Sequence, residues 1–406
     1  MSPRVSVIIP AYNAAEFVAE TIDSALAQTY RDFEVVVVDD GSTDATAEIL
    51  AAYGSAITVL RQPNGGPAAA RNCALRAARG ALVAPLDADD CWEDSFLSLM
   101  VDRLDRAPAA VVGVFSAWVA VDRSGAEIPN LGVARSAPVD LRELALGNRF
   151  QPSAVLVRRA AIVDAGGFDE VLPHGVEDWD LWLRLAAHGG RFVAVDRCLC
   201  RYRVHGESVS HRPDSMRAGR LGALEKLFGR ADLPPEVRAV QPRAFANAYL
   251  HSAVDMYANR RAADGERDFS LAVQSCPVLL SEDELYYAAI CATQPVGYKA
   301  SRHRLDLDDG AMRIAAALAR CVGDGAIPSG AAERQARGRA FRALARLALG
   351  QRSMAAARRH AAAALTADRR LWSDWGTVGT LIKSLAGATA IEALSRWRRQ
   401  RDTAGT

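Results

Sequence analysis

Residues 82–86 form an apolar run that leads directly into Asp87, Asp89 and Asp90. The short run predicts a buried β-strand whose end carries the three acids. Carboxylates this close repel one another and raise one another's pKa, so the folded chain must neutralise them. A divalent cation, held by one or two carboxylates together with substrate phosphate and water, would do this. Capping of a helix that begins near Glu93 is the alternative role for Asp89 and Asp90, and this stretch alone does not decide between the two.

Composition narrows the classes of protein to which this chain can belong. Its 406 residues suffice for two or three domains, and 50% of them are hydrophobic, which allows a sizeable core. The net charge of +1 argues against a broad basic surface, so we expect no nucleic-acid partner. No apolar stretch is long enough to span a bilayer, and Met1 leads into a strand without a signal-peptide pattern. The seven cysteines are scattered and odd in number, which predicts reduced thiols and a cytoplasmic chain.

Apolar strands alternate with helical patterns along the first part of the chain. Strands are predicted at 5–9, 33–38, 57–60 and 82–86, and helices at 14–29, 42–52 and 67–78. The strand at 33–38 is rich in valine, as is typical of a parallel strand buried on both faces. This alternation predicts an α/β fold with a doubly wound, mostly parallel sheet.

Polar residues follow three of these strands, and in such sheets ligands bind beyond the carboxyl ends of the strands. Pro10 and Tyr12 can flank a nucleotide base, Asp40 can accept a hydrogen bond from a base or ribose, and the acids from Asp87 onward can hold a metal with phosphates. Taken singly, Tyr12 can simply pack and Asp40 can simply belong to a turn. The sequence lacks GxGxxG and GxxxxGK[ST], which disfavours a dinucleotide oxidoreductase and a P-loop NTPase.

The next segment is predicted to complete the sheet. Further strands are expected at 111–121, 153–157, 191–195 and 198–204, helices at 160–165 and from Glu177 onward, and an irregular loop over the site at 126–150. The helix from Glu177 has Asp178 and Asp180 in its first turn, which the helix dipole favours. A charged helix start is one explanation, and a general base beside a bound substrate is the other.

Beyond about Arg217 the pattern changes to helices rich in alanine, arginine and leucine. Residues 334–350 and 353–366 predict a helical hairpin similar to a single tetratricopeptide unit, although such repeats need several copies. The last predicted helix, 378–401, ends in a basic segment that contains Trp397. Such an end can lie on an anionic membrane surface, or it can be the solvated end of a packing helix.

An ordered set of motifs resembles the family 2 glycosyltransferases, which are nucleotide-sugar enzymes with a GT-A fold. The motifs occupy residues 5–13, 38–44, 64–67, 70–72, 86–90, 167–170, 177–184 and 202–205. They occur in the family's order and cover roughly residues 4–212. Each motif is a weak signal, whereas the ordered set is a strong one. The resemblance implies a catalytic domain over residues 1–215. The change of pattern predicts an α-helical C-terminal domain over 216–406, which includes the hairpin near 334–366.

The resemblance also implies roles for the donor-binding residues. Pro10, Tyr12 and Asp40 would line the uracil or other base. Asp87 and Asp89 would form the family's DxD motif, which faces the diphosphate.

The metal and the chemistry follow from the same resemblance. Asp89 would bind Mn²⁺ or Mg²⁺, with Asp90 and His205 as further candidate ligands. The metal would neutralise charge on the diphosphate leaving group. Asp178 would be the general base that takes a proton from the acceptor hydroxyl. A single displacement would then invert the anomeric configuration.

The resemblance therefore predicts an inverting, metal-dependent glycosyltransferase that uses a nucleotide-diphosphate sugar, with a UDP-sugar as the expected donor. The acceptor would be a hydroxyl of a saccharide or a lipid-linked saccharide, in polysaccharide or glycolipid synthesis. Peripheral contact with the inner face of the cell membrane through the basic C-terminal helix is compatible with this function. A sugar-phosphate nucleotidylyltransferase and a non-catalytic nucleotide-sugar-binding module are the alternatives.

Overall fold

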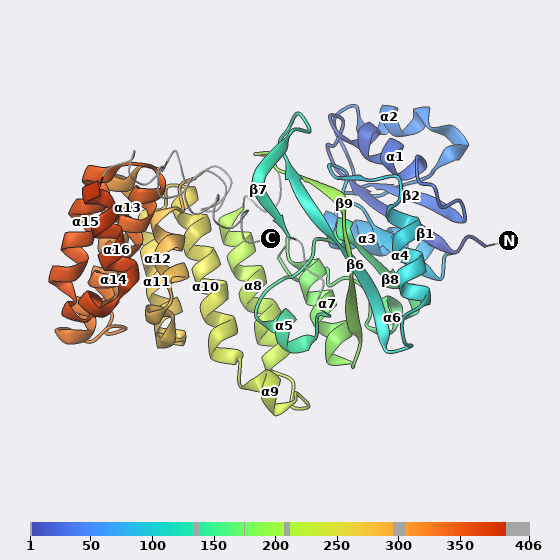
Figure 1. The fold of residues 1–406 in the computed structure, drawn as a ribbon. Coiled ribbons are helices and arrows are strands. Elements are labelled where there is room, and N and C mark those ends of the chain that lie inside the picture. The colour runs from blue at the N-terminus through green and yellow to red at the C-terminus, as the bar shows by residue number, and fades with distance from the viewer. Residues whose placement is uncertain (1, 134–137, 174, 207–211, 295–304, 387–406) are drawn as a thin grey trace, which may run out of the picture. The chain divides into compact units, whose positions relative to one another are not determined.

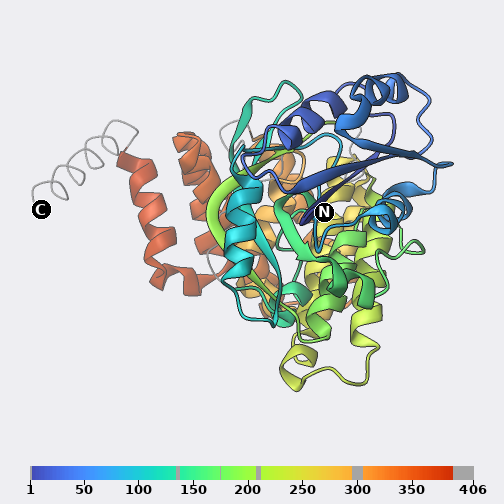
Figure 2. The ribbon, with the colours of Figure 1, turned by 90° about the vertical axis from the view of Figure 1, so that its right-hand side faces the viewer.

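The computed structural model describes residues 2–133, 138–173, 175–206, 212–294 and 305–386. The chain forms two compact units, Met1–Ala244 and Phe245–Thr406 (Figure 1). The first unit holds a mixed sheet with helices on both faces, and the second is helical (Figures 1 and 2). The predicted α/β fold followed by a helical region is therefore confirmed.

The sheet has nine strands in the order β3-β2-β1-β4-β8-β6-β9-β5, and β7 pairs with β6. The strands are β1 (Val5–Ala11), β2 (Phe33–Asp39), β3 (Thr58–Arg61), β4 (Leu82–Pro85), β5 (Cys91–Trp92), β6 (Val111–Val121), β7 (Glu127–Val133), β8 (Val155–Arg158) and β9 (Arg191–Arg203). Strands β3, β2, β1 and β4 run parallel to one another, with Val7 opposite Val35 on one side and Ala84 on the other. The strand order reverses beside β1, which is where ligands bind in sheets of this kind.

Burial on both faces explains the valine-rich strands. On one face, Val5, Val7 and Ile9 pack in a single core cluster with side chains from α1 (Val18–Leu26), α2 (Thr46–Ala52) and α4 (Phe96–Asp105). On the other face, α3 (Gly66–Ala77) packs against β1 and β2. Its small alanines permit this close approach. The sheet is thus a rigid base for the loops at its carboxyl edge.

Two predicted segments differ from the structure. The predicted loop at 126–150 contains β7 and α5 (Leu141–Ala145), because the turn at 122–125 closes a β6–β7 hairpin and Asp140 caps the short helix. The predicted strands at 191–195 and 198–204 form one strand, β9, whose register against β6 shifts midway. Residues 134–137 of the predicted loop lie outside the described residues.

Two further helices of the first unit pack against each other. They are α7 (Glu177–Ala187) and α8 (Pro213–Phe228); the shorter α6 (Arg159–Asp164) and α9 (Pro235–Arg238) belong to the same unit. Lys226 of α8 pairs with the buried Asp180 of α7 at 2.6 Å and with Asp169 at 2.5 Å. A Cβ atom at Gly219 would lie 2.4 Å from Val176, so only glycine lets α8 approach the start of α7 this closely.

The remaining helices are α10 (Gln241–Ala258), α11 (Ala262–Ser275), α12 (Asp283–Ile290), α13 (Leu307–Gly323), α14 (Ala331–Gly350), α15 (Met354–Ala367) and α16 (Trp375–Ala386). Helices α14 and α15 are consecutive and pack together, as the sequence predicts for 334–350 and 353–366. The last predicted helix is described only as far as Ala386, so Trp397 and the basic end lie outside the described residues. Within the described ranges, no helix has the length and apolar character needed to cross a bilayer.

The close approach of α8 to α7 makes a prediction about stability. We expect Gly219→Ala to lower the free energy of unfolding by about 1–3 kcal/mol, because the added methyl overpacks against Val176. Gly222→Ala, one turn later in the same helix, meets only the flexible end of Leu172 at 3.1 Å and should change stability by less than about 1 kcal/mol. Urea unfolding followed by circular dichroism measures both, and equal effects would contradict this packing.

Candidate active site

The loops that follow β1 and β2 are bonded to each other at the carboxyl edge of the sheet. The Asn13 main-chain N–H donates to the Ser42 hydroxyl at 3.0 Å, and the Thr43 N–H donates to the Asn13 side chain at 2.8 Å. Asn13 adopts a left-handed backbone with φ of 49°, a conformation that asparagine tolerates. This turn leaves the Tyr12 side chain half exposed beside Pro10. The predicted base-binding positions therefore lie at one edge.

Asp40 is buried and organises the loop before α3. Its carboxylate accepts hydrogen bonds from Gln62 at 2.7 Å and from the main-chain N–H groups of Gly65 at 3.0 Å and Gly66 at 2.8 Å. A carboxylate offers about four acceptor positions, so one remains for a ligand. Asp40 can thus hold the loop and still accept one hydrogen bond from a bound base.

Arg71 joins the acidic loop to the start of α7. This buried side chain donates to Asp87 at 2.5 Å and to Glu177 at 2.6 Å. Burial raises the pKa of both carboxyls, and the positive charge of the guanidinium lowers it. The net result is a pKa below the usual range for Glu177 and above the usual range for Asp87. One cation therefore ties two distant acids into a buried network.

Asp90 is fully buried, and both of its carboxylate oxygens have protein donors. The Ser153 hydroxyl donates to Oδ2 at 2.5 Å and the Arg203 main-chain N–H donates to Oδ1 at 2.8 Å. Burial, together with the nearby Asp89 and Asp87, raises the pKa of Asp90 well above its usual range. This geometry argues against the predicted role of Asp90 as a metal ligand. Helix capping is excluded for both acids, because α4 begins only at Phe96.

Asp89 points away from these partners and faces His205. Nε2 of His205 lies 2.9 Å from Oδ2 of Asp89, and the Asp89 side chain is 29% exposed. The His205 ring lies beside Phe17, with 5.0 Å between ring centroids, and its Nδ1 is buried without a hydrogen-bond partner among the described residues. The structure thus brings together two of the three predicted metal ligands.

The donor set fits a divalent cation that is shared with a ligand. Neighbouring ligands of an octahedral Mg²⁺ or Mn²⁺ ion, each about 2.1 Å from the metal, lie about 3 Å apart. The separation between Asp89 and His205 matches this value. Within the described part of the chain, no group of three or more His, Cys, Asp or Glu side chains could hold a metal by itself. Any metal here needs further ligands, such as diphosphate oxygens and water.

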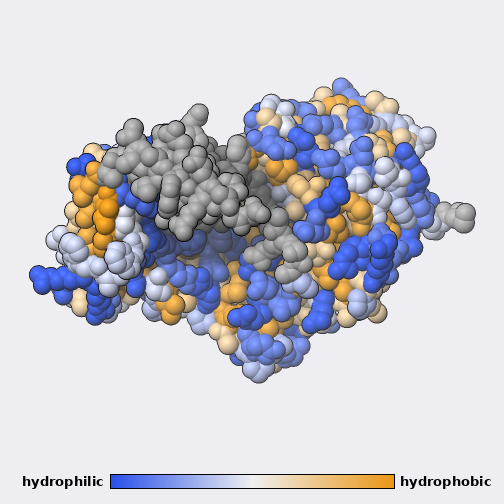
Figure 3. Space-filling model, in the orientation of Figure 1, coloured by the Kyte–Doolittle hydropathy of each residue, from blue (hydrophilic) through white to orange (hydrophobic). Residues whose placement is uncertain are grey.

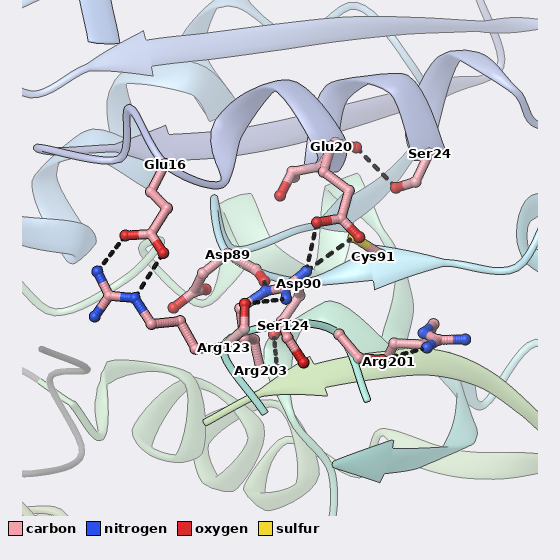
Figure 4. A network of polar contacts seen from close by, with 12 residues as sticks. Glu16, Glu20, Ser24, Asp89, Asp90, Cys91, Arg123, Ser124, Arg201 and Arg203 are labelled. Atoms are coloured by element: carbon pink, nitrogen blue, oxygen red, sulfur yellow. Dashed lines mark hydrogen bonds and ion pairs between the residues drawn. The ribbon is translucent and has the colours of Figure 1, made fainter. Parts of the chain in front are cut away.

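Arg203 fixes the main chain at Asp89 (Figure 4). Its buried guanidinium donates to the Asp89 carbonyl at 2.9 Å, to Glu20 of α1 at 2.7 Å and to the Arg123 carbonyl at 3.1 Å. It therefore links the acidic loop, α1 and the turn between β6 and β7. The neighbouring Arg123 in turn pairs with Glu16.

Asp178 stands in the first turn of α7, next to Glu177. It is 6% exposed, and the Asn148 side-chain amide donates to its Oδ2 at 2.8 Å. Burial is the main cause that raises its pKa to about 7, followed by the charge of Glu177, while Arg71 and Asn148 lower it. A carboxyl that titrates near neutral pH can take up and release a proton, as a general base must.

Sequence reasoning did not place Arg71, Arg203 and Asn148 among the site residues. Arg71 and Arg203 lie inside motifs at 70–72 and 202–205, which is a signal that could have marked them. Asn148 lies in the segment predicted as an irregular loop, and its sequence context gives no such signal.

Comparison with known proteins identifies the family. The model of glycosyl transferase family 2 matches residues 6–149. An uncharacterized glycosyltransferase of Rickettsia typhi is 30% identical over 215 residues, which cover 52% of this chain and 67% of that protein. The chain belongs to glycosyl transferase family 2.

Other relatives in family 2 are longer than the matched segment. A chondroitin synthase of Escherichia coli is 32% identical over 212 residues, which cover 51% of this chain and 30% of that protein. The chain covers 58% of a related glycosyltransferase of Rickettsia prowazekii and 36% of one from Rickettsia felis. It therefore spans less than two thirds of these relatives.

Solved structures support the GT-A fold. S. aureus TarS 1–349 in complex with UDP-GlcNAc has a TM-score of 0.51 at 20% identity, over 80% of this chain and 89% of that one. The mannosyltransferase PcManGT from Pyrobaculum calidifontis, in complex with GDP-Man and Mn²⁺, has a TM-score of 0.50 at 22% identity, over 80% and 88%. At these identities the likeness concerns the fold.

The Arg71 network makes a prediction within this family 2 chain. We expect Arg71→Met to lower the free energy of unfolding by about 3–5 kcal/mol, because it leaves the buried Glu177 and the partly buried Asp87 without their cation. Arg106→Met removes an exposed arginine whose partner, Asp102, is exposed as well, and it should change stability by less than about 1 kcal/mol. Urea unfolding measures both variants, and a small effect at Arg71 would contradict its bridging role.

Proposed function

We propose that this protein is an inverting, metal-dependent glycosyltransferase that transfers a sugar from a nucleotide-diphosphate donor to a hydroxyl acceptor. The observation that carries the proposal is the buried link from Asp87 through Arg71 to Glu177, the neighbour of Asp178. It holds the donor-binding loop and the candidate base in one network. We assign catalysis to a domain over residues 1–215, and the helical domain over 216–406 follows it.

The donor is proposed to be a UDP-sugar. Pro10, Tyr12 and the remaining acceptor position of Asp40 would bind the base at the edge shared by β1 and β2. Two structural neighbours carry nucleotide-sugars, UDP-GlcNAc in TarS and GDP-Man in PcManGT, which supports a donor of this class. Asp87 would face the diphosphate while Arg71 offsets its charge.

Asp89 and His205 are proposed to hold Mn²⁺ or Mg²⁺ together with the donor diphosphate. A metal bound there would neutralise the charge that develops on the leaving group. Asp90 would position the loop through Ser153 and the main chain of Arg203, and it is left out of the ligand set. Arg203 would keep Asp89 directed at His205 by holding its carbonyl.

Asp178 is proposed to accept the proton of the attacking hydroxyl. Its raised pKa makes it a stronger base than an exposed aspartate, and it is still half deprotonated near pH 7. Asn148 would orient the carboxylate, with Oδ2 engaged and Oδ1 directed to the acceptor. Attack opposite the leaving diphosphate inverts the anomeric centre in a single displacement.

The acceptor class is proposed to be a saccharide or a lipid-linked saccharide in polysaccharide or glycolipid synthesis. The similarity to the Escherichia coli chondroitin synthase supports polysaccharide synthesis. A cytoplasmic location is proposed because nucleotide-sugar donors are made there.

The decisive variant is Asp178→Asn, which keeps the shape of the side chain and removes the base. We expect the transfer rate to fall by about 10²–10⁴-fold with nucleotide binding unchanged. Asp196→Asn, at an exposed position on β9, is the matched control and should retain the wild-type rate. A sugar-transfer assay combined with calorimetry of nucleotide binding measures both. Transfer by Asp178→Asn at the wild-type rate, or pyrophosphate release from a nucleoside triphosphate, would contradict the proposal.

The environment of Asp178 also predicts how activity depends on pH. A base must be deprotonated to act, so kcat/KM should fall as the pH drops below about 7. Glu177→Gln removes a negative charge next to Asp178, so kcat/KM should begin to fall at a lower pH than in the wild type. Asn148→Ala removes a hydrogen bond to the charged form of Asp178, so kcat/KM should begin to fall at a higher pH. Shifts in the same direction for both variants would contradict the assignment.

A further inference from the structure

Helix α16 exposes three large apolar side chains. Its exposed side carries Trp375 (83% exposed), Ile382 (55%) and Leu385 (62%), and its buried side carries Thr377, Thr380 and Ser384. Helices on the surface of globular proteins normally show the reverse arrangement. Trp372, in the short η6 helix (Arg369–Ser373) just before α16, is also 61% exposed. We call Trp372, Trp375, Ile382 and Leu385 together the apolar strip.

The orientation of α16 is held by its contacts within the helical unit. The buried hydroxyls of Thr377, Thr380 and Ser384 donate to Asp374, the Gly376 carbonyl and the Leu381 carbonyl, at 2.5–2.7 Å. Val378 and Leu381 pack against the buried cluster of Ala364, Leu365 and Leu371. Because the inward hydroxyls are satisfied and Val378 and Leu381 are packed, Trp375, Ile382 and Leu385 are left facing outward.

The same end of the chain is strongly basic. Residues 331–386 contain eleven Lys and Arg against three Asp and Glu, a net charge of +8, whereas the whole chain carries +1. Arg358, Arg369, Arg370 and Lys383 are exposed and have no ion-pair partner among the residues that the structure describes. Three of them lie in η6 or α16, beside the apolar strip. In Figure 3 hydrophobic and hydrophilic colours adjoin at the end of this unit, where Figure 1 labels α15 and α16.

We propose that this surface binds an anionic phospholipid bilayer. The α16 surface comprises Trp372, Trp375, Ile382, Leu385, Arg369, Arg370 and Lys383. Tryptophan favours the boundary between headgroups and acyl chains, and the aliphatic residues gain by burial below it. Arginine and lysine beside them gain from the negative charge of the leaflet. The helix would lie on the membrane and not cross it.

Other occupants match the surface less well. A second copy of this chain would bring two α16 surfaces together, each with the cations Arg369, Arg370 and Lys383, which charge repulsion opposes. A nucleic acid would engage the cations and leave Ile382 and Leu385 in water. A bilayer rich in anionic lipid satisfies both kinds of side chain at once.

Membrane binding deepens the proposed function because it would present the catalytic unit to a lipid-linked acceptor. The two ideas fail independently, since vesicle binding is measured without donor or acceptor. A chain that binds vesicles and transfers no sugar would contradict the proposed function but not the proposal that the α16 surface binds membranes.

The test is co-flotation of the full chain with vesicles of phosphatidylcholine alone or mixed with phosphatidylglycerol. We expect binding to the anionic vesicles only, weakening as salt rises. The variants Trp375→Ser/Ile382→Ser and Arg369→Glu/Arg370→Glu should each lower the partition coefficient by at least about tenfold. All four positions are exposed, so the thermal unfolding midpoint should stay at the wild-type value.

Matched controls carry the same chemical changes elsewhere. Met312→Ser/Val278→Ser replaces two apolar residues that are 67% and 65% exposed, and Arg76→Glu/Arg197→Glu reverses two exposed charges in the first unit. Both controls should bind anionic vesicles like the wild type.

Three results would overturn the proposal. The first is a wild-type chain that does not float with anionic vesicles, or α16 variants that float as well as the controls. The second is light scattering that shows a wild-type oligomer and a monomeric Trp375→Ser/Ile382→Ser variant, because a second copy would then cover the strip. The third is loss of oligonucleotide binding in Arg369→Glu/Arg370→Glu with vesicle binding unchanged.

Discussion

Mutual repulsion among Asp87, Asp89 and Asp90 is the constraint around which the first unit is built. Two buried arginines relieve it in different ways. Arg71 neutralises Asp87, and the main chain of Arg203 joins Ser153 in satisfying Asp90. Asp89 has neither of these partners, and its partly exposed carboxylate faces His205. Three similar side chains in one short loop thus acquire three different environments.

The same arginines connect this loop to the rest of the unit. Through Glu177, Arg71 reaches the first turn of α7, where burial raises the pKa of Asp178 to about 7. The position of α7 depends in turn on Lys226 and on the close approach of α8 at Gly219. The packing of α8 against α7 therefore helps to set the place of the candidate base.

Local sequence patterns predicted the parallel strands, the start of α7 and the polar strand ends, because apolar runs and turn residues act over a few positions. They did not predict the bridging arginines, since Arg71 is 106 residues from Glu177 and Arg203 is 114 residues from Asp89. The same limit applies to Asp90. Its carboxylate is evident in the sequence, whereas its hydrogen-bond donors, Ser153 and Arg203, lie 63 and 113 residues further along the chain. The exposure of the apolar strip also depends on packing that the sequence pattern alone does not fix.

Asp87, Asp89 and Asp90 are assigned different roles, with Asp89 alone as a metal ligand. The most direct test of this assignment is anomalous diffraction from crystals of the chain grown with Mn²⁺ and a nucleoside diphosphate. The account predicts a Mn²⁺ peak between the Asp89 carboxylate and the His205 imidazole. It also predicts that Asp90 remains bonded to Ser153 and to the main chain of Arg203. A Mn²⁺ peak on Asp90, or bound nucleotide with the metal at neither Asp89 nor His205, would contradict it.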